Sequence, residues 1–268
     1  MKVRFIGVGM AWLALAGWTW AGPYAASGIP ANDPAFVGWA TGVAELVRGP
    51  QDIANPASPL ASFGSAANAL GAPGGTFDVV SLGDGGWITL TFASPIYNGP
   101  GPDFAVFENG FGFNGLIFGE LAFVEVSSNG VDFFRFPSVS LTQTATQLSN
   151  ADGIDPTAIH NLAGKFPARE GTPFDLQDLV GVSPLLDVHA ITHVRIIDVV
   201  GSLDPQYRRL DSQGNPINDP WPTDFASSGF DLDAVGVIHQ TPEPSALVLW
   251  GLGGLGIGWT RWRRRRAS

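Results

Sequence analysis

Residues 121–137 read LAFVEVSSNGVDFFRFP, and this stretch decides the class of fold. Two runs rich in β-branched and aromatic residues flank Asn129 and Gly130. Asn and Gly tolerate the positive φ angles that both central positions of a type I′ turn demand. The stretch therefore predicts a β-hairpin that closes at Asn129 and Gly130, and with it an antiparallel sheet.

Four other segments alternate apolar and polar residues or are β-branched and apolar, which is typical of strands: 87–92 (WITLTF), 103–108 (DFAVFE), 192–200 (THVRIIDVV) and 230–238 (FDLDAVGVI). Helical signals are few. Thr172 can cap a short helix that runs to Leu179, and residues 156–163 can form another turn or two. Segment 22–75 is rich in Ala, Pro and Gly, and we expect it to be a loop region before the first strand.

Many strands with short helices only in connections predict an all-β fold, an antiparallel β-sandwich. The string VEVSSNGVDFF also resembles one found in jelly-roll modules of the galactose-binding-like group, in which a strand ending in Val-Ser is followed by a turn and an aromatic residue. This resemblance covers about a dozen residues. It implies a jelly-roll arrangement and glycan binding.

The composition supports a folded domain. Of 268 residues, 45% are hydrophobic and 14% are charged, which excludes a disordered polar chain. The 35 Gly and 21 Pro show no triplet repeat, which excludes collagen and long helical bundles. Because the chain has no Cys, the core must hold the fold without disulfides, with or without a bound metal ion.

Charge is unevenly distributed along the chain. The formal net charge is -10, but residues 22–240 hold 23 acidic and only 7 basic side chains. The remaining cations lie in the two terminal segments, 1–21 and 241–268. An acidic surface repels phosphate backbones, so nucleic acid is excluded as a partner.

The N-terminal segment reads MKVRFIGVGMAWLALAGWTWA over residues 1–21. Two cations precede an apolar stretch, and Thr19 and Ala21 are residues at positions where signal peptidase requires a small side chain. This order predicts a secretory signal peptide that is cleaved after Ala21. An N-terminal core helix is the alternative interpretation.

The C-terminal segment, residues 241–268, reads TPEPSALVLWGLGGLGIGWTRWRRRRAS. A Pro-Glu-Pro motif precedes a Gly-rich apolar stretch and a cluster of arginines, in this order: Pro242, Glu243, Pro244, then Arg261, Arg263, Arg264, Arg265 and Arg266. The segment resembles the PEP-CTERM sorting signal of Gram-negative bacteria. The resemblance implies that an exosortase, a membrane-embedded cysteine transpeptidase, recognises the motif and removes the tail.

The apolar stretch 246–260 would span about 22 Å as a helix, against a hydrocarbon core of about 30 Å. We therefore expect a transient anchor in the inner membrane, followed by delivery to the cell surface or the exopolysaccharide matrix. The predicted organisation is a signal peptide at 1–21, a β-sandwich ectodomain at 22–240 and a sorting signal at 241–268.

Six carboxylates are candidate ligands of a divalent cation: Glu108, Asp198, Asp204, Asp219, Asp231 and Asp233. Asp231 and Asp233 alternate with the same period as Val235 and Val237, which predicts one shared strand face. A carboxylate at a core edge needs a cation or several donors, and basic side chains are scarce here. We expect a structural Ca²⁺ ion; the alternative is that these residues only form turns and caps.

Aromatic side chains outside the predicted strands are candidates for stacking on sugars, and we single out Trp221, Tyr207, Phe111 and Phe113. Packing beneath loops is the alternative. The chain has no GxSxG motif and no phosphate-binding loop. We therefore expect a non-catalytic structural or binding module that contacts exopolysaccharide, or a matrix component without a small ligand.

A secreted hydrolase of polysaccharides is the alternative from another class, because glycosidase carboxylates have no short sequence motif. Glu108, Asp231 and Asp233 are the candidates for its acid and base. A deep pocket with two carboxylates would favour the enzyme, whereas a shallow aromatic face would favour a binding module.

Overall fold

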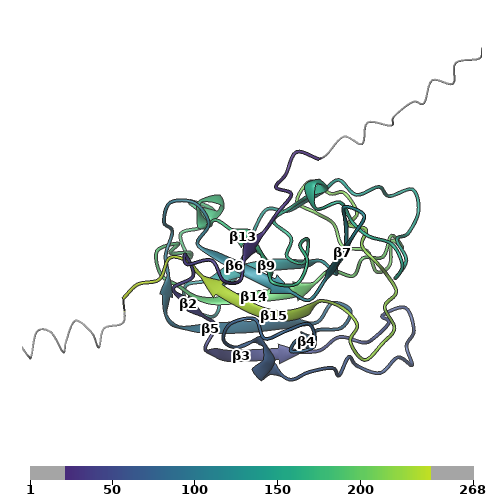
Figure 1. Cartoon of the computed structure of the whole chain (residues 1–268), viewed down its shortest axis with the longest axis horizontal. Coiled ribbons are helices and arrows are strands. Elements are labelled where there is room, and N and C mark those ends of the chain that lie inside the picture. Colours follow the sequence, from purple (N-terminus) through teal and green to yellow (C-terminus); the bar gives the residue numbers. More distant parts are fainter. Residues whose placement is uncertain (1–21, 243–268) are drawn as a thin grey trace, which may run out of the picture.

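The structure is a computed structural model, and it describes residues 22–242. Strands, loops and short 3-10 helices make up these residues, which contain no α-helix. Strand pairing is antiparallel in both large sheets. The prediction of an all-β, antiparallel, sandwich-like fold is therefore confirmed, and Figure 1 shows the strands in their overlying layers.

The first sheet has the strand order β1–β13–β6–β15–β2, and β4 also pairs with β15. Its strands are β1 (Ile29–Pro30), β13 (Glu170–Phe174), β6 (Phe104–Glu108), β15 (Asp231–Val237), β2 (Gly38–Trp39) and β4 (Val80–Ser81). Strands β6 and β15 lie at its centre and are buried along their full lengths. Burial on both faces explains why both segments read as nearly continuous apolar runs.

The second sheet has the order β10–β9–β14–β5–β3. Its strands are β10 (Phe134–Arg135), β9 (Ala122–Ser127), β14 (Ile191–Asp198), β5 (Trp87–Ile96) and β3 (Gly42–Val47). Two ribbons complete the strands: β7 (Phe111–Phe113) with β8 (Leu116–Phe118), and β11 (Val139–Ser140) with β12 (Ile159–His160).

The main core lies between the two sheets. Ile88 and Leu90 of β5 and Val194 of β14 belong to the same buried cluster as Phe104 of β6 and Val235 of β15. Full burial of each such side chain stabilises the fold by about 1.5–3 kcal/mol. In Figure 1, β15 overlaps the region of β14 and β5, the strands with which it shares this core.

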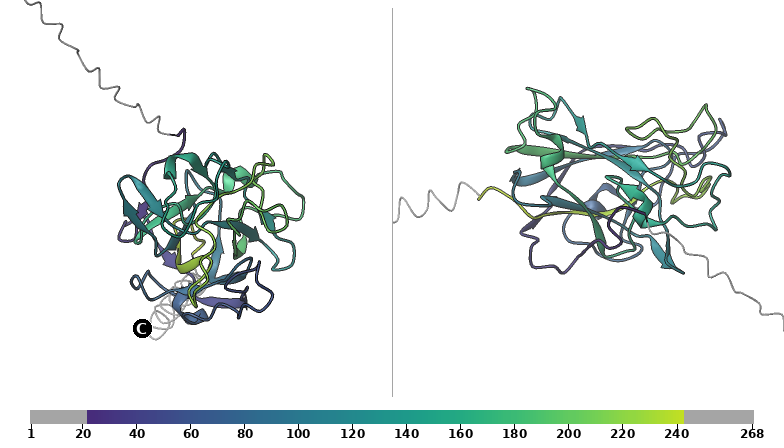
Figure 2. Two further views of the ribbon diagram at one scale, coloured as in Figure 1. Left: turned by 90° about the vertical axis from the view of Figure 1, so that its right-hand side faces the viewer. Right: turned by 90° about the horizontal axis from the view of Figure 1, so that it is seen from above.

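Smaller clusters cover the outer faces of the sheets. Phe36 and Trp39 pack on Phe107 of the first sheet, with ring centroids 5.0–5.6 Å apart. On the second sheet, Phe123 belongs to a cluster with Ile154, to which β8 and β12 also contribute Ile117 and Ile159. The described chain starts and ends at different sides of the domain, as the purple and yellow ends in Figure 2 show.

The hairpin at 121–137 forms, but the predicted turn type is wrong. Strands β9 and β10 pair antiparallel with Phe134 opposite Val126, so the connection is longer than two residues. Gly130 has a φ of 75°, whereas Asn129 is not among the residues with positive φ. The Asn129 side chain instead accepts hydrogen bonds from Val131 N and Asp132 N, both at 2.9 Å. Hydrogen bonds to this side chain, rather than a type I′ turn, thus stabilise the connection.

Segment 22–75 is not only a loop region, which corrects the sequence prediction. It contributes β1, β2 and β3, and β3 pairs with β5 along five residues of each strand. The β3 sequence, GVAELV, lacks the strict alternation that identified the other strands. Pairing at a sheet edge, a tertiary effect, determines its conformation.

A β-bulge in β15 breaks the predicted shared face. The pairing of β15 with β6 shifts register between Leu232 and Ala234. Leu232 then lies in the same core cluster as Val235 and Val237, which alternation alone would place on opposite faces. The bulge therefore separates Asp231 and Asp233 from the face of Val235 and Val237.

The predicted short helices are single 3-10 turns, at Pro156–Ala158 and Leu176–Leu179. The second begins after Asp175, whose side chain accepts from Gln177 N, so Thr172 is not its cap. A third 3-10 turn lies at Ala66–Ala69. Thr172 lies within β13 instead, paired with Val106.

No helix within residues 22–242 has the length and hydropathy needed to cross a membrane. The predicted signal peptide and apolar tail lie outside the described residues. So do Glu243, Pro244 and the arginines at 261 and 263–266, whereas Pro242 is the last residue described.

Candidate binding cavity

A cavity of about 360 Å³ lies where β6 ends and β15 begins. Two kinds of side chain dominate its lining. Carboxyl groups come from Glu108, Glu120 and Asp231, and phenyl rings come from Phe77, Phe111, Phe118 and Phe225. Polar neutral groups, including Asn109 and Thr223, complete the wall.

Strand pairing brings the three carboxyl groups together from distant parts of the sequence. Glu108 is the last residue of β6 and pairs opposite Leu232, so it lies next to Asp231 at the start of β15. Glu120 lies two residues before β9, directly after the β7–β8 ribbon that carries Phe111 and Phe118. The cavity therefore lies between the end of the first sheet and this ribbon.

Short hydrogen bonds fix the orientation of each carboxyl group. Glu108 Oε2 accepts from Gly110 N at 2.6 Å, and Glu120 Oε1 accepts from Thr223 Oγ1 at 2.6 Å. Asp231 accepts from the Ser81 hydroxyl and, through Oδ2, from Asn109 Nδ2 at 3.2 Å. A Cβ atom at Gly110 would lie 2.8 Å from the backbone oxygen of Phe118 and 2.6 Å from Glu108 Oε2, so the close approach of these two segments favours glycine.

Burial shifts all three acids toward their neutral forms. Desolvation, followed by the charge of Asp231, raises the pKa of Glu108 well above its usual value. The same two causes, in the same order, raise the pKa of Glu120 well above its usual value. Desolvation raises the pKa of Asp231 to about 6, against hydrogen bonds from Ser81 and Asn109 that lower it. A neutral carboxyl group both donates and accepts hydrogen bonds.

No basic side chain of residues 22–242 lines this cavity. The charge of Arg48 acts on one of its acids and lowers the pKa of Asp231. The Arg48 guanidinium already donates to the carbonyl oxygens of Phe63, Gly64 and Ser81 at 2.7–2.9 Å. The acids of the cavity thus have little compensation from positive charge.

Three phenylalanines expose their rings at the cavity: Phe77 is 81% exposed, Phe111 58% and Phe225 52%. Among residues 22–242 these are the exposed phenylalanines, and all three lie at this one site. Exposed rings are unfavourable in water, and their concentration around a cavity is typical of binding sites.

The structure separates most of the predicted metal ligands. Glu108 and Asp231 line the cavity, but Asp198 accepts from Gly85 N at 2.8 Å and from Phe230 N at 2.7 Å. Backbone N–H groups also donate hydrogen bonds to three other candidate carboxylates. Asp219 accepts from Leu121, Asp233 from Gly74 and Asp204 from Gln206. Within residues 22–242, no group of three His, Cys, Asp or Glu side chains is arranged to hold a metal ion.

Of the predicted sugar contacts, Phe111 lines the cavity and the others do not. Trp221 is partly buried, and its Nε1 donates to Asp84 Oδ2 at 3.0 Å. Tyr207 lies beside it, with ring centroids 6.4 Å apart. Phe113 is half-buried, and its ring centroid is 6.3 Å from that of Phe111.

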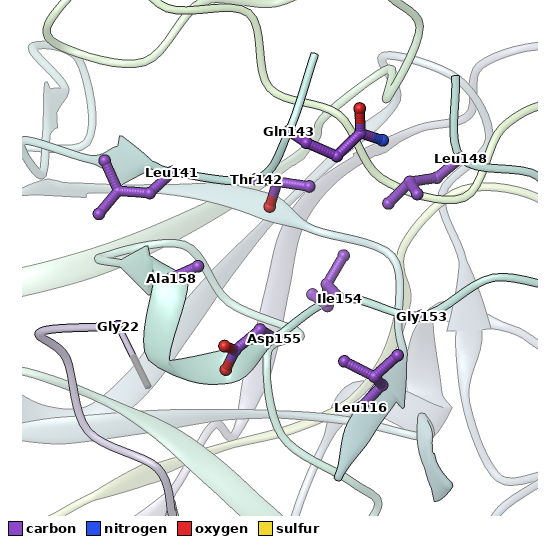
Figure 3. A pocket seen from close by; sticks show the side chains of 10 residues that line it. All are labelled: Gly22, Leu116, Leu141, Thr142, Gln143, Leu148, Gly153, Ile154, Asp155 and Ala158. Atoms are coloured by element: carbon purple, nitrogen blue, oxygen red, sulfur yellow. The ribbon is translucent and has the colours of Figure 1, made fainter. Parts of the chain in front are cut away.

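A second cavity, of about 370 Å³, is lined largely by apolar side chains, among them Leu116, Leu141 and Leu148 (Figure 3). Among residues 22–242, Asp155 is the one ionisable side chain that lines it, and its Oδ1 accepts from Thr157 N and Thr157 Oγ1 at 2.9 and 2.6 Å. This carboxylate already accepts hydrogen bonds within its own turn, so the cavity has few polar groups that could bind a ligand.

Sequence reasoning missed Glu120, Phe77 and Phe225. Phe77 and Phe225 are single aromatic residues within the polar loop sequences GGTFD and TDFASSG, and this isolation was an available signal. Glu120 carried no such signal, because only the fold shows that it is buried beside Asp231.

Comparison with protein-family models and with curated proteins finds no match to this chain. The fold and the cavity are therefore the basis for assigning a function.

Proposed function

We propose that this chain is an exported, non-catalytic β-sandwich module that binds polysaccharide in the cavity at the end of β6. The observation that carries the proposal is that Phe77, Phe111 and Phe225 expose their rings around three buried carboxyl groups. Aromatic rings stack on the apolar faces of sugar rings, and fixed polar groups select hydroxyl positions. A jelly-roll arrangement of the strands belongs to this proposal.

Location forms the second part of the proposal. The signal peptide and the PEP-CTERM-like tail lead to export, transient anchoring in the inner membrane and processing by an exosortase. The mature protein then lies at the cell surface or in the exopolysaccharide matrix. Its acidic body supports an extracellular polymer, rather than nucleic acid, as the partner.

Glycan binding by the full-length chain, purified in a polyoxyethylene detergent, tests the binding function. We expect wild-type protein to bind a subset of immobilised oligosaccharides, and F111A to lose that binding. L185A is the matched control, because Leu185 is 57% exposed and lies outside the cavity lining. Equal binding by F111A and wild-type protein would contradict the proposed site.

A polysaccharide hydrolase is the second candidate, and one observation favours it. Glu108, Glu120 and Asp231 line one cavity, and burial raises the pKa of each, which is the direction of shift that a general acid needs. Release of reducing ends from the bound polysaccharide, abolished in E120Q, would establish catalysis. Stable binding without release would leave the non-catalytic module.

A further inference from the structure

The carboxyl groups of the cavity have no cation beside them among residues 22–242. Glu108, Glu120 and Asp231 line the cavity, no Lys, Arg or His of the described chain does, and the guanidinium of Arg48 is bound to three carbonyl oxygens. Buried carboxylates are stable only when neutral or when paired with positive charge. A cationic ligand would supply the positive charge that these carboxyl groups need in order to ionise.

Glu120 has a carboxyl oxygen that is free to meet such a ligand. Glu120 is only 8% exposed, and its Oε1 accepts from Thr223, but its Oε2 has no hydrogen-bond partner within residues 22–242. Glu120 lines the cavity, so its carboxyl group lies beside a space that a donor group can enter. A charged donor would make a stronger hydrogen bond here than a neutral hydroxyl group.

The rim and the size of the cavity favour an organic cation over a metal ion. The exposed rings of Phe77, Phe111 and Phe225 lie at the cavity, with Phe111 stacked on Phe118, and aromatic rings both attract cations and stack on sugar rings. The volume of about 360 Å³ lies within the usual range for small-molecule sites. The described residues also contain no three acidic or His ligands arranged around one point.

We propose that the cavity binds a protonated amino sugar, a 2-amino-2-deoxyhexose unit of a cationic polysaccharide. This inference rests on the proposed function and names its class of ligand. The ammonium group donates to Glu120 Oε2 and approaches Asp231, and the sugar ring lies against the phenyl rim. The excess of acidic residues in 22–240 attracts such a polymer and repels anionic ones.

Binding must also move protons. An ammonium group favours the ionised form of a carboxyl group that faces it, so one ammonium group balances the loss of one proton from the three acids. The charged groups that act on these acids are Asp198 and Asp233, which oppose ionisation, and Arg48, which favours it. Calorimetry in buffers of different ionisation enthalpy detects this release.

Calorimetry with the full-length chain in a polyoxyethylene detergent, at about pH 6 where amines are protonated, tests the inference. The probes are the tetramer of glucosamine, its fully N-acetylated counterpart, a lysine tetrapeptide and CaCl₂. We expect the glucosamine tetramer to bind about tenfold or more tightly than the acetylated tetramer and to release protons.

Variants assign the binding to the cavity. E120Q keeps the Thr223 hydrogen bond and should weaken glucosamine binding about tenfold. F77A, at a position that is 81% exposed and does not stabilise the core, should also weaken it. E45Q is the matched control, because it removes one negative charge from an exposed position outside the cavity.

Each other outcome overturns the inference in a distinct way. Equal binding of both tetramers, lost in F77A, would show a neutral-sugar site and leave the proposed function intact. Tighter binding of the lysine peptide would indicate a protein partner, and displacement of the sugar by CaCl₂ would indicate a metal site. Absence of binding by every sugar, here and on the glycan surface, would refute the proposed function itself.

Discussion

The hydroxyl group of Thr223 donates a hydrogen bond of 2.6 Å to Oε1 of Glu120, across 103 positions of sequence. Both residues are buried, so this bond joins the loop before β15 to the turn before β9. It also leaves Oε2 as the atom of Glu120 that is available to a ligand. For the proposed ligand, affinity should therefore depend on Thr223 through the position that it gives to Glu120.

T223V should separate this positioning role from binding itself. Valine has nearly the shape of threonine but no hydroxyl group, so the Glu120 carboxyl group loses its donor. Leaving a buried polar group without its partner costs about 1–3 kcal/mol, and we expect the Tm to fall accordingly. The pKa of Glu120 should rise further, because the Thr223 bond lowers it. T144V, at an exposed threonine without such a bond, is the control and should melt as the wild type does.

Stability should fall as pH rises from about 4 to about 8. Folding raises the pKa of Asp231 and of Asp233 to about 6 and that of Asp198 to about 8, in each case mainly by desolvation. The folded state therefore binds more protons than the unfolded state in this range, so the free energy of unfolding decreases with pH. His160 and His193, whose pKa values burial lowers, contribute the opposite slope over a narrower range.

Urea denaturation at a series of pH values measures this slope. D233N should flatten it, because asparagine does not titrate. A free energy of unfolding that increased steadily from about pH 4 to about pH 8 would contradict the assignment of these buried acids as protonated.

Gly201 should tolerate no side chain. A Cβ atom there would overlap Asp219 Oδ1, and Asp219 Oδ2 accepts from Leu121 N at 2.9 Å. G201A must therefore displace a buried carboxyl group and break its bond to the chain before β9, so we expect a loss of several kcal/mol. G75A is the matched control, because a Cβ atom at Gly75 meets nothing within 4 Å. Similar Tm values for the two variants would refute this account.

The structural Ca²⁺ ion stays a prediction from the sequence. Asp204 is the candidate ligand that is exposed and lies outside the cavity, with one backbone hydrogen bond, from Gln206 N. An ion that binds the folded chain there should raise the Tm in millimolar CaCl₂ relative to chelator, and D204N should reduce the increase. Identical melting curves with CaCl₂ and chelator would remove calcium from the description of this protein.

Local pattern was enough for four of the longer strands. The segments 87–92, 103–108, 192–200 and 230–238 coincide with β5, β6, β14 and β15, within one or two residues except at the end of β5, which continues to Ile96. Period-2 alternation and β-branched content reflect burial on a sheet, and both can be read without knowing the partner strand. The position of the hairpin could also be predicted from local sequence. The conformation of its turn could not, because the Asn129 side chain competes with the backbone as acceptor of N–H groups.

The sequence by itself determined an antiparallel β domain, an acidic body and two terminal segments with the patterns of export and sorting signals. Only the tertiary structure decided the site. Phe77, Glu108, Glu120, Phe225 and Asp231 come from separate segments, and they meet because β6 pairs with β15 and the ribbon β7–β8 folds beside them. Strand register, the bulge in β15 and burial depend on contacts between distant residues, and no local pattern encodes such contacts.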